Sequence, residues 1–192
     1  AYGDDSEIPF SLTSADWQET DQILAGVMTT FGELTNEFEI AGWGTFNGVI
    51  QGPISSPLVS GVFAAEGLRL WDVMWGRWTG EAIIEDGYYE ITDGHVTDGG
   101  SEIKFDGRFA FTYPRIDGDE EMNATFQITD RRATDFLTAF EQVGYRIEGL
   151  LSGELHLYGH YEAPFGFGQM SMRNGTVYGE PVESGVAGLR FE

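Results

Sequence analysis

Cysteine is absent from this 192-residue chain, which excludes disulfide bonds and thiolate chemistry. Lysine is nearly absent too, because Lys104 is the one lysine among ten basic residues, against 32 acidic residues. The formal charge of −22 repels nucleic acid and anionic lipid headgroups, so it disfavours a DNA-binding or membrane-surface role. No run approaches the roughly 18 apolar residues that a membrane-spanning helix needs.

We expect no secretory leader at the start of the given sequence, since Asp4, Asp5 and Glu7 stand where basic and then apolar residues would be required. The chain does not begin with methionine, and its last segment, 186–191, still has a strand pattern. We therefore expect an internal fragment of a longer, repeat-built chain, in which residues 1–192 form a single domain. Hydrophobic residues make up 41%, enough for a core, and 27 glycines against six prolines favour an all-β fold with many bends.

Alternation of apolar and charged residues marks Ile103–Phe111 as a strand with one apolar and one polar face. After a turn at Tyr113–Glu120 the pattern returns in Met122–Ile128, which predicts an antiparallel partner for the first strand. Further strands, many punctuated by glycine, are expected at 42–50, 58–70, 73–84, 88–92, 147–158, 167–173, 176–179 and 186–191.

Aspartate or asparagine followed by glycine predicts several reversals of the chain. Turns are expected at Asp86-Gly87, at Asp93-Gly94 and at 98–100, and Asn174-Gly175 is the strongest hairpin signal. Within the strand 73–84, the even-numbered residues from Met74 onward should share one face.

Apolar residues at helical spacing predict two amphipathic helices. Residues 13–32 form the first, which begins at a Thr-Ser cap and ends at a glycine. Residues 130–143 form the second, in which Asp130 caps a stripe of Ala133, Phe136, Leu137 and Phe140. Both helices are expected to pack on the apolar face of the sheet.

No residue pattern points to catalysis. His156 and His160 have the i, i+4 spacing of a helical metal site, but on a strand they would stand roughly 13 Å apart, too far to share one ion. Nucleophile motifs, phosphate-binding glycine loops and metal triads are all missing. Two of the many carboxylates could still pair in space as acid and base, which sequence spacing does not test. The sequence thus predicts a protein without enzymatic activity, metal site or cofactor.

A repeated phrase of glycines and alternating apolar residues resembles a known family. Residues 44–61 have the series GTFNGVIQGPISSPLVSG, and residues 151–159 and 172–181 have similar phrases. In the first phrase a crossover marked by prolines separates two strands. The series is similar to the glycine-punctuated phrase of AsmA-like and TamB-type translocation and assembly module proteins, and the likeness covers most of residues 38–192.

This resemblance implies a curled, β-taco-like trough in a parent protein that is anchored in the inner membrane and spans the periplasm of a double-membraned bacterium. Such a trough would guide phospholipid acyl chains between membranes and support outer-membrane biogenesis, with an outer-membrane barrel assembly protein as a further partner. Aromatic residues and methionines on one face, with acids on the other, would also solvate hydrocarbon on physical grounds. The candidate lipid-binding residues are Trp78, Ile84, Ile103, Phe105, Phe109, Phe111, Phe126, Ile128, Leu155, Leu157, Met170 and Met172.

The same twelve side chains fit a second interpretation. They could form an ordinary closed core packed against the two predicted helices. The chain would then be a structural or assembly scaffold that binds a protein partner and no lipid.

Overall fold

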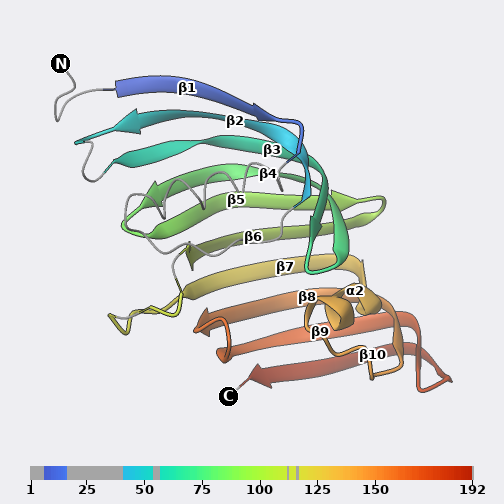
Figure 1. Ribbon diagram of the computed structural model, residues 1–192. Helices are drawn as coiled ribbons and strands as arrows, with labels where there is room; N and C mark the ends of the chain where they lie inside the picture. Colours follow the sequence, from blue (N-terminus) through green and yellow to red (C-terminus); the bar gives the residue numbers. More distant parts are fainter. Residues whose placement is uncertain (1–6, 17–40, 54–56, 112, 116, 192) are drawn as a thin grey trace.

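Ten antiparallel strands form one unclosed sheet in the computed structural model, which describes residues 7–16, 41–53, 57–111, 113–115 and 117–191 (Figure 1). Each strand pairs with the next one along the chain, so the sheet runs from β1 to β10 without a crossover. A mainly β, antiparallel, meandering sheet was predicted, and this part of the prediction is confirmed. The strands are β1 (Glu7–Ser14), β2 (Ala41–Gln51), β3 (Leu58–Leu70), β4 (Val73–Glu85), β5 (Tyr88–Asp98), β6 (Ser101–Ala110), β7 (Met122–Arg132), β8 (Ile147–Gly159), β9 (Pro164–Val177) and β10 (Glu180–Phe191).

Two-residue loops in which both residues have positive φ join three of the strand pairs. Trp71-Asp72 connects β3 to β4, Asp86-Gly87 connects β4 to β5, and Tyr178-Gly179 connects β9 to β10. Both residues of each pair have positive φ, between 50° and 86°. Turns of this hand match the right-handed twist of the strands that they join.

The described part of the chain contains one helix, α2 (Ala133–Ala139), which is shorter than the predicted helix at 130–143. The prediction that Asp130 caps this helix is wrong. Asp130 has a φ of 54°, lies inside β7, and forms an ion pair with Arg173 of β9. The next two residues pair with β8, so the chain stays extended until the helix begins.

The predicted helix at 13–32 is not supported where the structure describes it. Thr13 and Ser14, the expected cap, belong to β1 and pair with β2. Residues 17–32 lie outside the described residues.

Two predicted turns are bulges inside longer strands. Asp93 has a φ of 50° and lies within β5, and Asn174 has a φ of 52° and lies within β9. The reversal expected at Asn174-Gly175 occurs four residues later, at Tyr178-Gly179. Asp and Asn adopt the left-handed conformation in bulges as well as in hairpins, so the local sequence does not decide between the two.

Bulges recur in every odd-numbered strand from β3 to β9. The left-handed residues are Gly67, Asp93, Asp130 and Asn174, and each lies beside a shift in the strand register. A bulge bends its strand and reverses the face that the following side chains take. α2 contacts both β4 and β8, which are four strands apart in the sheet (Figure 1).

The register shift near Gly76 overturns the predicted face of Met74. Gly76 has a φ of 95°, and beyond it the alternation of β4 changes phase. Val73 and Trp75 are therefore buried, at 4% and 9% exposed, whereas Met74 is 49% exposed.

One face of the sheet carries the hydrophobic core. Side chains from β3 to β7 and from β9 form a single buried cluster, against which Phe136 of α2 and Leu189 of β10 also pack. We call this the trough face and its opposite the outer face. The buried members of the cluster are Leu68, Val73, Trp75, Ile91, Val96, Ile103, Phe105, Ile128 and Met170.

Candidate functional site: an apolar trough face

The trough face is built from rows of side chains that run across the strands. In one row Phe105 of β6 pairs with Phe126 of β7, which pairs with Leu155 of β8. The rings of Phe105 and Phe126 stack with centroids 5.7 Å apart. Rows of this kind form because alternate residues of each antiparallel strand point to the same face.

Eleven of the twelve candidate lipid-binding residues lie on strands of this face, and Phe111 continues it just beyond the end of β6. The Phe111 ring lies 5.1 Å from the ring of Tyr89, measured between centroids, and Tyr89 pairs with Phe109. The burial of the twelve candidates differs along the face. Seven are buried, namely Ile103, Phe105, Phe111, Ile128, Leu155, Leu157 and Met170. Five are half-buried, namely Trp78, Ile84, Phe109, Phe126 and Met172.

Large side chains on this face lie over glycines of the neighbouring strand. A Cβ placed on Gly94 would stand 2.6 Å from Cε1 of Phe105 and 2.7 Å from its carbonyl oxygen. A Cβ on Gly80 would stand 2.8 Å from Cζ of Phe63. Glycine is therefore required in these places by close approach of a ring.

The apolar face continues to the first strand of the sheet. In β1, Ile8 is 44% exposed and Leu12 is 38% exposed, and they pair with Ile50 and Phe46 of β2. Hydrophobic surface on the trough face is thus buried in the middle of the sheet and open to solvent at the β1 edge.

Trp78 places a polar group among the apolar side chains. Its ring lies 5.0 Å from Phe63 and 5.7 Å from Phe105, measured between centroids. Its indole Nε1 is buried and makes no hydrogen bond with the described residues.

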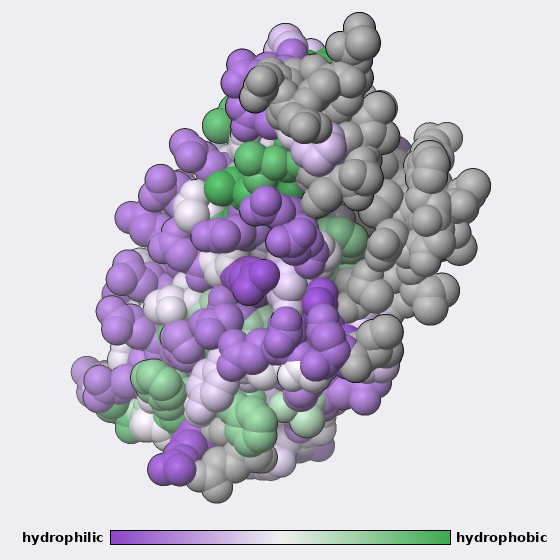
Figure 2. All heavy atoms as spheres, turned by 90° about the vertical axis from the view of Figure 1, so that its left-hand side faces the viewer, coloured by the Kyte–Doolittle hydropathy of each residue, from purple (hydrophilic) through white to green (hydrophobic). Residues whose placement is uncertain are grey.

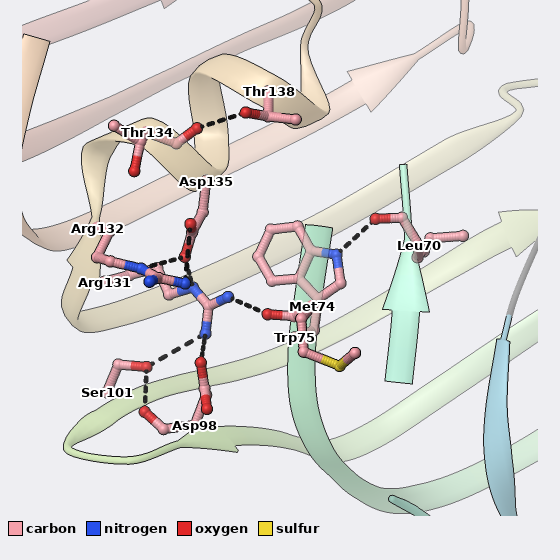
Figure 3. Close-up of polar contacts among 10 residues, drawn as sticks. All are labelled: Leu70, Met74, Trp75, Asp98, Ser101, Arg131, Arg132, Thr134, Asp135 and Thr138. Atoms are coloured by element: carbon pink, nitrogen blue, oxygen red, sulfur yellow. Dashed lines mark hydrogen bonds and ion pairs between the residues drawn. The ribbon is translucent and has the colours of Figure 1, made fainter. Parts of the chain in front are cut away.

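A buried arginine joins four elements at one end of the trough face (Figure 3). Arg131 is 1% exposed, and its Nη2 donates to the Met74 carbonyl oxygen at 2.7 Å. Its Nε lies 2.7 Å from Oδ2 of Asp135 in α2, and its Nη1 lies 3.5 Å from Oδ2 of Asp98. Nη1 also donates to Oγ of Ser101 at 3.3 Å. A guanidinium buried this deeply is stable only when its charge is paired, so these contacts connect β4, β7, α2 and the β5–β6 turn.

A buried carboxylate organises the opposite end of the sheet. Glu121 is 2% exposed and accepts N–H groups from Tyr161 at 2.8 Å and from Arg115 at 3.0 Å. Burial alone would raise the pKa of Glu121, but these two N–H groups and the nearby His160 outweigh it and hold this pKa below its ordinary value of 4.5. Burial, together with the Glu121 charge, raises the pKa of Tyr161, whose hydroxyl donates to the Ala110 carbonyl oxygen at 2.8 Å.

The outer face carries charge and an open groove. The groove has a volume of about 580 Å³ and crosses β5, β6 and β7, with Glu90, Asp106 and Arg108 among its lining residues. The Arg108 guanidinium lies 3.6 Å from the ring centroid of Tyr88. Figure 2 shows a largely hydrophilic surface on the side of the molecule that carries the β4–β5 hairpin, with smaller hydrophobic patches between the polar residues.

His156 and His160, which were expected not to share a metal ion, contact different residues. The His156 ring stacks on Phe167 at 5.2 Å between centroids, and its Nδ1 lies 2.9 Å from Oγ1 of Thr125. The His160 Nδ1 lies 3.4 Å from Oε1 of Glu121. Among the residues that the structure describes, no group of three or more His, Cys, Asp or Glu could hold a metal ion.

The twelve candidate residues leave out the buried Arg131 and five members of the buried cluster, which are Leu68, Val73, Trp75, Ile91 and Val96. Of these, Leu68, Val73 and Trp75 lie in the β3–β4 hairpin, where bulges reverse the phase. Their signal was a pair of glycines, Gly67 and Gly76, on either side of an apolar hairpin. Arg131 carried no signal, because an arginine beside a predicted helix cap is ordinarily solvent-exposed.

Fold and face together define a class, an open antiparallel β-meander with an apolar face that α2 covers at one end. Comparison of the chain with protein-family models, with curated proteins and with solved structures finds no match. The likeness to AsmA-like and TamB-type proteins therefore rests on the glycine-punctuated phrases alone. Within the described residues, no helix has the length and apolar character needed to cross a membrane.

Proposed function

We propose that this chain is a non-enzymatic segment whose β-trough guides phospholipid acyl chains. In the proposal the parent protein is anchored in the inner membrane, spans the periplasm and supports outer-membrane biogenesis, with an outer-membrane barrel assembly protein as a partner. The observation that carries the proposal is one apolar face that continues from Ile8 in β1 to Leu189 in β10. Hydrocarbon is held on such a face by removal of apolar surface from water, without specific polar contacts.

Three features support this function over a chain that only folds on itself. Phe126 and Met172 stay half-buried although they lie in the middle and later strands of the trough face. Methionine and aromatic side chains adapt to flexible apolar ligands. The strong negative charge of the chain would keep a protein with this much apolar surface soluble.

A second candidate function is a scaffold that binds a protein partner and no lipid. Its specific support is the burial of seven of the twelve candidate residues, with Phe105 at 8% and Ile128 at 4% exposed. These side chains behave as a core within the chain itself. Under this alternative, the apolar β1 edge would be the surface that meets the partner.

Two neighbouring isoleucines allow a direct test. Ile84 is half-buried on the trough face, and Ile83 is 39% exposed on the outer face. Ile84→Asp places a charge where an acyl chain would lie, and Ile83→Asp places the same charge on the other side of the same strand. The measurement is binding of oleate to purified protein by fluorescence displacement, with circular dichroism to confirm that both variants are folded.

The acyl-chain proposal expects the unmodified protein and Ile83→Asp to bind oleate, and Ile84→Asp to bind at least about tenfold more weakly. Mass spectrometry of the protein purified in mild detergent should also find phospholipid. Absence of oleate binding and of co-purified lipid in the unmodified protein would refute the proposal and favour the scaffold.

A further inference from the structure

The tip of the β3–β4 hairpin, residues 67–76, leaves the sheet and folds over the trough face. β4 pairs with β5 from Arg77 onward, so the residues before it have no partner in β5. Figure 1 shows the tip crossing toward β7 and α2. One pair, Ala41 with Arg69, still connects the tip to β2.

The inner side of the tip covers one row of the trough face. Leu68, Val73 and Trp75 belong to the same buried cluster as Ile103 and Ile128. The Trp75 ring also meets Phe136 of α2 edge to face, with centroids 6.1 Å apart. The tip therefore occupies the space above Ile103 and Ile128 that an acyl chain on this face would need.

The tip is held as a unit by contacts within itself. Trp75 Nε1 donates to the Leu70 carbonyl oxygen at 2.9 Å, whereas the ion pair of Arg69 with Asp72, at 3.0 Å, is exposed to solvent and contributes little. Two glycines with positive φ lie at its base, Gly67 at 63° and Gly76 at 95°. A rigid tip on two glycine positions is the arrangement expected of a hinged element.

One charged residue fastens the tip to the rest of the protein. Arg131 donates to the Met74 carbonyl oxygen at 2.7 Å, and its guanidinium lies 4.9 Å from the ring centroid of Trp75 (Figure 3). The same guanidinium is paired with Asp135, so this connection, which we call the latch, links the tip to α2. Contacts to a backbone oxygen and to a ring face can separate without leaving Arg131 unpaired, because its carboxylate partners stay behind.

We propose that residues 67–76 form a lid over the trough face, latched by Arg131, which must lift before a hydrocarbon chain occupies the space above Ile103 and Ile128. This inference rests on the proposed acyl-chain function for its purpose, but the lid movement itself can be measured without any ligand. In the closed state the lid competes with the ligand, so weakening the latch should increase apparent affinity.

The absence of cysteine makes the movement measurable by spin labelling. Met74 on the outer side of the lid and Thr134 on α2 are both exposed and can be changed to cysteine and labelled. Arg131→Met removes the latch charge and replaces the guanidinium side chain with a shorter, unbranched apolar one. Arg69→Met is the matched control, because it removes an arginine and an ion pair from the surface of the lid alone.

The lid proposal expects one narrow distance distribution between the labels in the otherwise unmodified protein and in Arg69→Met. In Arg131→Met a second population with a longer label distance should appear without ligand. In the otherwise unmodified protein, oleate should produce this second population. Oleate affinity of Arg131→Met should rise by about tenfold. Distances that stay the same in Arg131→Met and with bound oleate overturn the lid.

Failure of the acyl-chain function would give a different result, because oleate would then bind neither to the otherwise unmodified protein nor to Arg131→Met. If Arg131→Met does not fold, the label distances in the protein without that substitution, measured with and without oleate, test the lid on their own. An unchanged distance with oleate bound then overturns the lid, and a longer one supports it.

Discussion

Truncation of Phe105, compared with truncation of an exposed phenylalanine, tests whether the Phe105 ring is buried on the trough face. Phe105 is 8% exposed, and its ring lies 5.7 Å from both Trp78 and Phe126, measured between centroids. Phe167 of β9 is 59% exposed and stacks only on His156 among the described rings. The pair Phe105→Ala and Phe167→Ala therefore removes the same atoms from two different surroundings.

The expected cost follows from burial. Loss of a buried phenylalanine ring destabilises a protein by about 3–5 kcal/mol through lost transfer energy and a residual cavity. Loss of an exposed ring with one stacking neighbour should cost about 1 kcal/mol. Because typical domains are stable by about 5–15 kcal/mol, Phe105→Ala should remain folded at 25 °C but close to its limit.

Urea unfolding followed by circular dichroism measures both costs. With a dependence of about 2 kcal/mol per molar urea, Phe105→Ala should lower the unfolding midpoint by about 2 M, and Phe167→Ala by about 0.5 M. Equal shifts for the two variants, or a larger shift for Phe167→Ala, would show that the assignment of the buried face is wrong.

Three further predictions concern the buried charge, the buried phenol and the glycine beneath Phe105. The lowered pKa of Glu121 stabilises the fold above about pH 4.5, and this contribution is lost as the pH falls through the folded-state value. Urea midpoints of Glu121→Gln should thus fall less between pH 5 and about pH 3 than those of the parent; an identical decline would contradict the assignment. The raised pKa of Tyr161 predicts that stability falls above about pH 10, and that Tyr161→Phe flattens this alkaline decline in thermal melts; an equally steep decline in the variant would count against it. Gly94→Val should destabilise by at least about 1–3 kcal/mol through overpacking. Gly100→Val, in the β5–β6 turn with no atom within 4 Å of its Cβ position, should cost much less, and equal urea midpoints would refute the close approach of Phe105.

Alternation was sufficient to predict the antiparallel sheet and part of its trough face. Ile103, Phe105, Phe126 and Ile128 lie on one face because the period of two is set by the extended backbone itself. Antiparallel pairing of consecutive strands followed from the short turns between them. Neither property depends on distant parts of the chain.

The bulges could not be predicted from the same local signals. Asp93-Gly94 and Asn174-Gly175 have the residues of a hairpin, yet the strands continue through them because their neighbours continue too. Which alternative is formed depends on strand pairing across the sheet, which local sequence does not contain. Each missed bulge also reversed the side-chain phase beyond it, as at Met74.

The start of the helix and the burial of Arg131 could not be predicted for a related reason. Asp130 has the residue type of a helix cap, but its carboxylate is held by Arg173 from another strand. Arg131 is buried because the hairpin tip folds back over it. Both outcomes depend on contacts between elements far apart along the chain.

The unbroken order from β1 to β10 has a consequence for how the protein folds. Nearly all strand contacts join neighbours in sequence, so the sheet can grow one hairpin at a time, with little loop-closure entropy at each step. The contact of α2 and β7 with β4 is an exception, since it joins elements that are not adjacent in the sheet. We expect it to form last, so that strand pairing precedes the burial of Arg131 during refolding.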